Sequence, residues 1–447
     1  MKSVKIKKVD QKISGTLSFP GDKSLSHRAI IFGSIAEGVS SFTNVLAGED
    51  CAYTHKAFET MGVKIESKSP TEISITGRGL HSLQDPKKEL YLGNSGTSMR
   101  LLLGLLAGAG IEATLTGDAS LSSRPMRRVT DFLKQMGASF EGGDGADFAP
   151  IMVRGGKLKG IDAKLPVSSA QVKSAILLAA LYADGKTSVT EPEKSRDHTE
   201  RFLEYFGVKI EKCRGEAAPR PYTVSIEGGQ NLKAKSFAIA GDISSAAFFI
   251  VMALLLPEPV IQFRKILCNP TRTGILEVLK RMGVEFSEWM PREGGLAGPE
   301  PIVDFWLRGK PKALKNFEIK KEELPSLIDE LPILMVLATQ VQGTSIIHDA
   351  GELRVKETDR IHSMATGLRR MGAQIRVEGN TLYIDGPKTL SGNEIDSFKD
   401  HRTATSLIVA GMIAEGQTVV RDVECIKTSF PGFFGFLDRL GVHYETC

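Results

Sequence analysis

A short pattern that ends in glycine occurs six times in this 447-residue chain, and it constrains the fold more than any other feature. In each copy, two apolar residues three positions apart are followed by Gly, by Val or Ala, and then by one residue and another apolar one. The six glycines, which are separated by 75, 70, 76, 89 and 69 residues, are Gly62, Gly137, Gly207, Gly283, Gly372 and Gly441. Apolar residues at this spacing form a buried helix face, and Gly ends a helix in the left-handed conformation. The alternation that follows indicates a strand. The sequence therefore predicts six repeated α/β units.

A second series of six segments runs between these glycines. Each segment is a long apolar helix that opens with small polar or charged residues, and the openings are marked by Lys23, Gly96, Ser169, Asp242, Asp329 and His401. The steps between the markers are 73, 73, 73, 87 and 72 residues. These helices are apolar on too many sides to lie on a surface, so we expect them to be buried. Their first turns leave backbone N–H groups unpaired and carry the positive end of the helix dipole, which favours anions.

The composition narrows the class of protein. The net charge of +4 permits acidic small substrates, and no basic run is interleaved with aromatic residues as a nucleic-acid groove requires. The five cysteines are scattered without a CxxC pair, which is typical of reduced thiols in a cytoplasm. The most apolar run, 246–256, is too short to span a bilayer. We therefore expect a cytoplasmic protein that binds neither nucleic acid nor membranes.

The chain is long enough for two or three hydrophobic cores, and six units favour two domains of three units each. We place an N-terminal lobe at residues 21–240 and a C-terminal lobe at 241–447. The leading strand, within residues 1–20, has no complete unit of its own and could complete either sheet.

Several candidate anion-binding residues stand at the helix openings of the N-terminal half. In the segment GDKSLSHR, an ammonium, a hydroxyl and a guanidinium share one helix face, a set that suits a carboxylate or phosphate. In GNSGTSMR, two glycines allow a close backbone approach to a ligand. Pro125 forces Arg124 out of the helical conformation and into a loop. Ser168, Ser169 and Gln171, joined by Ser195 one strand later, form a neutral phosphate cradle. Each segment alone also fits an ordinary helix cap or a solvated charged face.

The C-terminal half carries acids among its cations. Asp329 stands at a helix start between apolar residues, where a carboxylate can serve as a base or only as a cap. In the segment RVKETDRI, Lys356 and Arg360 are expected to share a helix face, where like charges repel unless an anion binds between them. Arg402 opens the last apolar helix.

Five of these segments, in order and properly spaced, resemble the 3-phosphoshikimate 1-carboxyvinyltransferase (5-enolpyruvylshikimate-3-phosphate synthase) family of enolpyruvyl transferases. They read GDKSLSHR, GNSGTSMR, SLSSRPM, RVKETDRI and DHRTATS, and the resemblance covers nearly the whole chain. It implies a two-domain inverse α/β barrel-like fold with six βαβαββ units, three per domain, closing around a cleft, and with the leading strand in the C-terminal lobe. It also implies transfer of the carboxyvinyl group of phosphoenolpyruvate to the 5-hydroxyl of shikimate 3-phosphate with release of phosphate, by a monomer that uses no metal or other cofactor.

The resemblance also assigns roles to residues by motif. The implied ligands of shikimate 3-phosphate are Lys23, Ser24, Arg28, Ser168, Ser169, Gln171, Ser195, Asp329 and Lys356. The implied ligands of phosphoenolpyruvate are Lys23, Gly96, Arg124, Gln171, Arg360 and Arg402. The implied catalytic residues are Asp329 as the base, Glu357 as the acid that protonates the vinyl methylene, and Lys23.

Three positions depart from the family pattern, and two other functions remain as alternatives. Ala170 stands where many members have a second Ser, Glu352 where some have Asn, and His198 where some have Tyr. These departures bear on inhibitor sensitivity and leave the reaction in place.

One alternative is the sister transferase that acts on UDP-N-acetylglucosamine, but that enzyme uses a loop Cys, and no Cys lies between positions 51 and 213. The other is a non-catalytic anion- or RNA-binding repeat protein, which would gain little from Asp329 and Glu357.

Overall fold

The computed structural model describes residues 2–215, 221–292, 298–309 and 313–447. The chain forms two compact units. The N-terminal unit comprises Gly21–Ile239 and a short stretch that ends at Glu300, and the C-terminal unit comprises Met1–Pro20 and Ala240–Cys447 apart from that stretch. Residues 241–447 were all expected in one lobe, whereas Glu300 packs with the N-terminal unit.

Each unit contains three four-stranded sheets of the same topology within the described residues. In every sheet one edge strand is parallel to its neighbour, and the other pairs are antiparallel. In the N-terminal unit, the first sheet contains, in order across it, β14 (Ser236–Ala238), β3 (Glu37–Thr43), β5 (Glu72–Arg78) and β4 (Lys64–Ser69). The second contains β6 (Leu90–Tyr91), β7 (Glu112–Thr116), β9 (Phe148–Arg154) and β8 (Ser139–Gly142). The third contains β10 (Asp162–Lys164), β11 (Lys186–Glu191), β13 (Tyr222–Glu227) and β12 (Ile210–Arg214). In the C-terminal unit, the first sheet contains, in order across it, β2 (Ser14–Ser18), β15 (Val260–Leu267), β17 (Ile302–Arg308) and β16 (Ser287–Arg292). The second contains β18 (Glu318–Ile319), β19 (Gly343–Ile347), β21 (Thr381–Gly386) and β20 (Gln374–Glu378). The third contains β22 (Glu394–Asp396), β23 (Gln417–Arg421), β1 (Ser3–Lys7) and β24 (Tyr444–Thr446).

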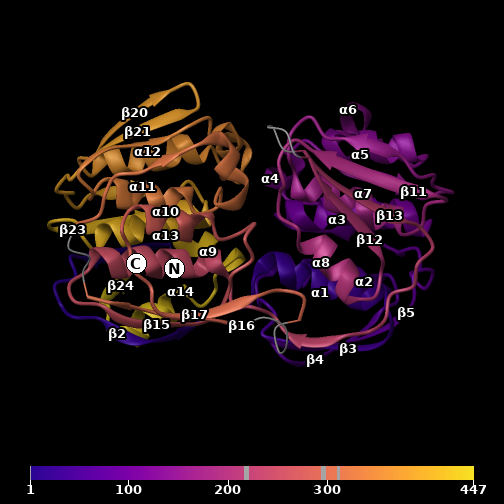
Figure 1. Ribbon diagram of the computed structural model, residues 1–447, viewed down its shortest axis with the longest axis horizontal. Helices are drawn as coiled ribbons and strands as arrows, with labels where there is room; N and C mark the ends of the chain where they lie inside the picture. The colour runs from indigo at the N-terminus through magenta and orange to yellow at the C-terminus, as the bar shows by residue number, and fades with distance from the viewer. Residues whose placement is uncertain (1, 216–220, 293–297, 310–312) are drawn as a thin grey trace. The chain divides into compact units, whose positions relative to one another are not determined.

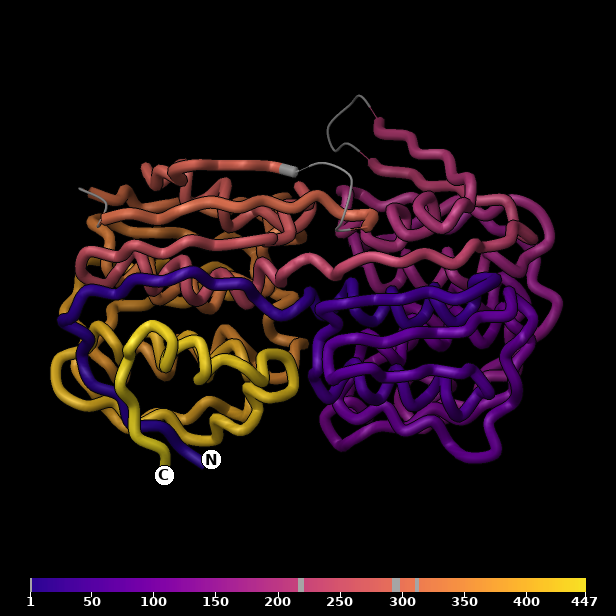
Figure 2. The backbone as a smooth tube through the Cα atoms, turned by 90° about the horizontal axis from the view of Figure 1, so that it is seen from below, coloured from indigo at the N-terminus to yellow at the C-terminus, as the bar shows by residue number. Residues whose placement is uncertain are grey.

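The N-terminal segment forms two strands rather than the single leading strand that we expected. β1 lies between β23 and β24, and β2 pairs with β15, so the two strands complete different sheets of the C-terminal unit. Figure 2 shows this indigo segment among the pink and yellow strands. Val9 and Ile13 are buried between the two strands, which anchors the change of sheet. The pairing of β1 with β24 also brings the chain termini together (Figure 1).

The six repeated glycines end six helices, as the sequence predicted. The helices are α2 (Glu49–Thr60), α5 (Arg127–Met136), α8 (His198–Tyr205), α10 (Gly274–Arg281), α12 (Arg360–Arg370) and α14 (Phe433–Arg439). Every one of these glycines has a positive φ, between 72° and 109°. In each case the next residue donates its N–H to the carbonyl five positions back, as Val63 does to Phe58. This is the Schellman arrangement, which satisfies carbonyls at a helix end that have no partner within the helix.

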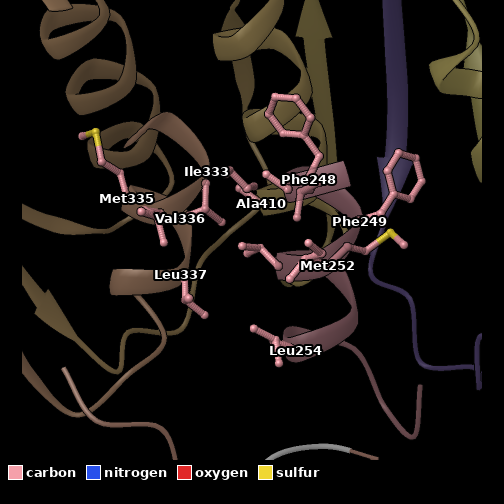
Figure 3. Packing of buried hydrophobic residues seen from close by; sticks show 14 of the residues in the cluster. Phe248, Phe249, Met252, Leu254, Ile333, Met335, Val336, Leu337 and Ala410 are labelled. Carbon is pink, nitrogen blue, oxygen red and sulfur yellow. The ribbon is translucent and has the colours of Figure 1, made fainter. Parts of the chain in front are cut away.

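The six apolar helices form the two cores, as expected. They are α1 (Lys23–Ile35), α3 (Gly96–Ala109), α7 (Ala170–Ala180), α9 (Ile243–Leu255), α11 (Leu331–Ala338) and α13 (His401–Gly411). α11 and α13 are buried along their whole lengths, and the other four helices are buried over most of theirs. Figure 3 shows how side chains of α9, such as Phe248 and Leu254, pack near those of α11 and α13. The remaining short helices are α4 (Ala119–Ser122), α6 (Gly143–Ala146), η1 (Lys321–Ser326), η2 (Gly351–Val355) and η3 (Val423–Thr428). Among the described residues, no helix is long and apolar enough to cross a membrane.

The glycine turns predict a contrast between two substitutions to alanine. Gly207 has a φ of +97°, and nothing lies within 4 Å of an added Cβ, so Gly207→Ala tests the backbone conformation alone. We expect this variant to lose about 1 kcal/mol of unfolding free energy, the cost of a left-handed residue with a side chain.

Gly435 lies inside α14, also with open space around an added Cβ, and provides the matched control. Gly435→Ala should raise the unfolding free energy by roughly 0.5–1 kcal/mol, because alanine favours a helix interior. Urea unfolding followed by circular dichroism compares the two. Equal shifts of the same sign would contradict a helix-ending role for Gly207.

Candidate active site

Arg360 is the centre of the polar cluster in the C-terminal unit. Its guanidinium, 1% exposed, donates from Nε to Asp400 at 2.9 Å, from Nη2 to Glu357 at 2.5 Å and from Nη1 to Asp329 at 3.4 Å. Burial alone would lower the pKa of Arg360, but attraction to Asp400, Glu357 and Asp329 outweighs burial and raises the pKa above its ordinary value. The cation is therefore permanent and is held by three carboxylates.

Arg402 joins the same cluster from the first turn of α13. It donates to the backbone carbonyl of Asp329 at 3.0 Å, and its Nε lies 3.6 Å from the Asp329 carboxylate. Asp400 caps α13 by accepting from the N–H groups of Arg402 and Thr403, while its other oxygen holds Arg360. One fully buried carboxylate thus fixes the Arg360 guanidinium relative to the backbone at the head of α13.

The prediction of a shared helix face for Lys356 and Arg360 was wrong. α12 begins only at Arg360, because Asp359 caps it by accepting the N–H of His362. Lys356 follows the 3₁₀ turn of η2 in an extended conformation, half-buried. The two cations therefore project from different kinds of backbone, and Glu357 lies in the link between them.

In the N-terminal unit, α1 carries Lys23 and Ser24 in its first turn and Arg28 in its second. Asp22 caps the helix through the N–H of Leu25. Lys23 forms an ion pair of 3.0 Å with Asp50, which lies in the first turn of α2 and is 10% exposed. The ammonium is thus oriented by a carboxylate from the neighbouring helix.

Arg28 is buried rather than displayed on a helix face. It donates to Thr199 at 2.8 Å, to Ser174 at 2.8 Å and to the carbonyl of Ser24 at 3.0 Å. Burial lowers its pKa to about 10, so it stays a cation at neutral pH. Arg28 therefore ties α1 to α7 and α8.

The head of α3 gathers Gly96, Arg124 and Gln171. A Cβ added at Gly96 would lie 3.3 Å from Arg124 and 3.4 Å from Arg100, so this glycine lets two guanidinium groups approach the helix head. Gln171, from α7, accepts from Arg100 at 2.6 Å and donates to Thr97 at 3.0 Å. Arg124 donates to the side chain and the carbonyl of Asn94.

The three serines of the expected phosphate cradle have different roles in the structure. Ser168 donates to the carbonyl of Glu193 at 2.6 Å and accepts its N–H at 2.9 Å. Ser195, 3% exposed, donates to Glu191 at 2.6 Å. Ser169 caps α7 by accepting the N–H of Val172, which leaves the hydroxyl proton of Ser169 to donate elsewhere.

Contacts bring some of the expected site residues together within each unit. Asp329, Glu357, Arg360 and Arg402 meet in the C-terminal unit. In the N-terminal unit Gly96, Arg124 and Gln171 surround the head of α3, and Arg28 bonds to Ser24. Among the described residues, no group of three or more His, Cys, Asp or Glu side chains could hold a metal ion.

Sequence reasoning missed several residues that support these side chains. They are Asp50, Arg100, Lys173, Glu191 and, as the link between two cations, Asp400. Lys173 carried a usable signal, because it is the single charged residue in the apolar segment 170–180, and a charge buried in a core needs a partner. Arg100 and Asp400 lie in the segments GNSGTSMR and DHRTATS but were given no role, and Asp50 and Glu191 carried no such signal, since Lys23 and Lys173 are distant in the sequence.

The three departures from the family pattern have clear positions. Ala170 is the first residue of α7 and therefore offers no hydroxyl at that helix head. His198, at the start of α8, pairs with Glu300 at 2.7 Å, and both side chains are buried. Glu352 is half-buried in η2.

Comparisons with known proteins show similarity to one enzyme family over the whole chain. A sequence model of the EPSP synthase (3-phosphoshikimate 1-carboxyvinyltransferase) family matches residues 7–437. A 3-phosphoshikimate 1-carboxyvinyltransferase from Citrifermentans bemidjiense is 48% identical over 426 residues, which are 95% of this chain and 96% of the relative. One from Bacillus cereus is 44% identical over 440 residues, 98% of this chain and 100% of the relative.

Solved structures agree with this result. The EPSP synthase of Acinetobacter baumannii is 41% identical, with a TM-score of 0.86 over 100% of this chain and 99% of that chain. The enolpyruvyl transferase NikO of Streptomyces tendae is 18% identical, with a TM-score of 0.75 over 99% and 98% of the chains, and shows the fold alone. The two-domain inverse α/β fold predicted from the sequence is confirmed.

His27, next to Arg28, predicts a pH dependence of stability. Its side chain is fully buried, and its Nδ1 lies 2.8 Å from the hydroxyl oxygen of Thr54. Burial lowers the pKa of His27 to about 4. The unfolded chain takes up a proton near pH 6.5, but the folded chain resists until about pH 4. Stability that is present above pH 6.5 is therefore lost as the pH falls towards 4, by roughly 3 kcal/mol over that window.

A His27→Asn variant keeps a polar group near Thr54 but has nothing to titrate, so its stability should fall less between pH 7.5 and pH 4.5. Urea unfolding at both pH values measures the difference, and the value at pH 7.5 gives the cost of the substitution itself. Parallel losses in the two proteins would remove His27 as the cause.

Proposed function

The chain belongs to the EPSP synthase (3-phosphoshikimate 1-carboxyvinyltransferase) family, and from that premise we propose which of its residues perform the family reaction. The enzyme transfers the carboxyvinyl group of phosphoenolpyruvate to the 5-hydroxyl of shikimate 3-phosphate and releases phosphate, a step of the shikimate pathway to aromatic amino acids. The observation that carries the assignment of residues is the joining of Asp329, Glu357 and Arg402 around Arg360.

The cationic residues bind the substrates. Each substrate carries a phosphate and a carboxylate, so bringing the two together requires several positive groups to offset their repulsion. In the proposal, phosphoenolpyruvate is bound by Arg124 and Gln171 beside Gly96, and by Arg360 and Arg402. Their fixed hydrogen bonds support this role, because preorganised donors need little rearrangement when charge develops.

Shikimate 3-phosphate is bound by a second set of groups. The residues proposed to form this site are Lys23, Ser24, Arg28, Ser168, Ser169, Gln171, Ser195, Asp329 and Lys356. The hydroxyl proton of Ser169 supports a direct contact with phosphate, since the capping bond of that serine uses only its oxygen. Ser168 and Ser195 contribute through their bonds to neighbouring segments, which hold the backbone around the ligand, and Arg28 contributes its positive charge.

Two carboxylates perform the proton transfers. Asp329 accepts the proton of the 5-hydroxyl group while the oxygen of that hydroxyl attacks the enol carbon of phosphoenolpyruvate. Glu357, in its protonated form, donates a proton to the methylene carbon, and its carboxylate then takes back a methyl proton as phosphate leaves, which restores the vinyl group. Binding of the phosphoenolpyruvate carboxylate to Arg360 would replace the present bond to Glu357, which frees that acid for the transfer. Lys23 contacts both substrates.

We further propose a cytoplasmic monomer that acts on these two small molecules and binds no nucleic acid. The free state of the five cysteines supports a reducing compartment. The modest net charge of +4 supports small acidic ligands rather than a polyanion.

Phosphate release tests the reaction directly. With phosphoenolpyruvate and shikimate 3-phosphate, the protein should release phosphate in amounts equal to the carboxyvinyl product. With UDP-N-acetylglucosamine in place of shikimate 3-phosphate, release should stay at background. The opposite preference would assign the chain to the sister transferase, and no release with either acceptor would favour a binding protein.

Replacement of Asp329 tests the proposed base. Asp329→Ala removes a proton acceptor and also one negative partner of Arg360 and Arg402, so substrate binding should remain detectable by calorimetry. We expect kcat to fall at least about a hundredfold, the usual contribution of a general base. Asp385→Ala, which removes an exposed carboxylate of β21 in the same unit, is the matched control and should keep full activity. Full turnover in Asp329→Ala would disprove the assignment of the base.

A further inference from the structure

We propose that Lys173 and Glu191 form a buried positioning pair for the phosphate end of the shikimate 3-phosphate site, and that Ser195 acts through this pair rather than as a direct phosphate ligand. The inference rests on the proposed function of the same site. Neither Lys173 nor Glu191 was expected from the sequence, and neither side chain is exposed.

Glu191 gathers three donors from two segments. It is the last residue of β11, and its Oε1 accepts the N–H of Ser169 at 2.9 Å and the hydroxyl of Ser195 at 2.6 Å. Its Oε2 lies 3.3 Å from the N–H of Ser195. A single carboxylate therefore joins the head of α7 to the loop that follows β11. Removing its negative charge would weaken all three bonds together, since charged acceptors form the stronger hydrogen bonds.

Lys173 supplies the charge that allows Glu191 to be buried there. It lies one turn beyond Ser169 in α7, and its Nζ is 2.7 Å from Glu191 and 2.8 Å from Glu200. Although burial by itself lowers the pKa of Lys173, the carboxylates of Glu200 and Glu191 outweigh burial and raise it. The lysine remains charged and offsets part of the negative charge of Glu191 and Glu200, which weakens the repulsion of a phosphate bound at the helix head.

The hydrogen-bond directions separate the two serines. A phosphate dianion accepts hydrogen bonds and has no proton to donate, so a serine ligand must give it a hydroxyl proton. Ser195 already gives its proton to Glu191 and is 3% exposed. Ser169 gives its N–H to Glu191 and keeps its hydroxyl proton, since that oxygen only accepts from Val172. Glu191 thus fixes the backbone of Ser169, whose hydroxyl proton we assign to the phosphate.

The same buried region also holds Arg28. Ser174 follows Lys173 and Thr199 precedes Glu200, and both hydroxyls accept from the Arg28 guanidinium at 2.8 Å. The side chains of Ser174 and Thr199 are linked to each other at 2.6 Å. The Lys173–Glu191 pair therefore supports two proposed phosphate contacts, the cation Arg28 and the hydroxyl of Ser169.

The test measures each substrate separately in a Glu191→Gln variant. Glutamine keeps the volume and leaves Lys173 paired with Glu200, so the fold should survive. We expect the KM for shikimate 3-phosphate to rise about tenfold or more, while the KM for phosphoenolpyruvate changes less than about twofold. Calorimetry with shikimate 3-phosphate alone should show the same loss of affinity. A merely structural role would lower the melting temperature without changing the ratio of the two KM values.

A double variant decides how Ser195 acts. If Ser195 works through Glu191, then Ser195→Ala combined with Glu191→Gln should bind shikimate 3-phosphate no more weakly than Glu191→Gln alone. Multiplying losses would instead make Ser195 a direct ligand and overturn that half of the inference. Ser195→Ala by itself removes one hydroxyl and no charge, so it keeps the question testable if Glu191→Gln fails to fold. We expect this variant to raise the same KM by a smaller factor.

The matched control is Glu211→Gln, which removes a carboxylate from the exposed Lys186–Glu211 pair between β11 and β12. It should leave both KM values unchanged. Wild-type affinity for shikimate 3-phosphate in Glu191→Gln would overturn the inference while leaving the family reaction intact. If the unaltered enzyme fails to turn over shikimate 3-phosphate, the proposed function itself fails, and this outcome is separate.

Discussion

The burial of six apolar helices is the constraint on which the rest of the structure depends. A helix that is surrounded by protein cannot satisfy its first N–H groups with water, so each head needs acceptors from the protein. Five of the six helices use an Asp or Ser side chain for this purpose. The sixth, α11, has no side-chain cap, but Pro332 in its first turn has no N–H to satisfy. Most polar residues of the site stand at these heads, because a polar side chain buried farther along a core helix needs a partner, as Lys173 has in Glu191.

Carboxylates are as important as cations in the two polar clusters. Asp400 caps α13 and holds Arg360, Asp50 orients Lys23, and Glu191 is paired with Lys173. An unpaired charge buried in a core is costly, so a buried cation such as Arg360 or Lys173 needs acidic partners. The proposed binding of anionic substrates is therefore an exchange of partners, in which a substrate oxygen replaces a protein carboxylate. That exchange links binding to chemistry at Glu357, because the proposed acid is also a partner of Arg360.

The repeat units and the buried helices could be predicted from the sequence, because both depend on local interactions. A glycine such as Gly62 adopts its left-handed conformation for reasons contained within one turn of helix, and the same reasons apply at all six positions. The proposed site residues were found from motifs, and their assignment stays a prediction. The start of α12 was predicted too early, since the cap by Asp359 fixes it after Lys356. The supporting residues Asp50 and Glu191 were missed because their partners are brought to them only by folding.

The sequence by itself determined the six-fold repetition, the class of fold and the family, since helix periodicity, glycine turns and ordered motifs are all written along the chain. Only the tertiary structure decided that Arg360 meets Asp400, that β1 and β2 complete different sheets, and that the Arg28 guanidinium is bonded to Ser174 and Thr199. The physical reason is distance along the chain. Hydrogen bonds and ion pairs between remote residues depend on packing that brings them within about 3 Å, and no local pattern encodes that approach.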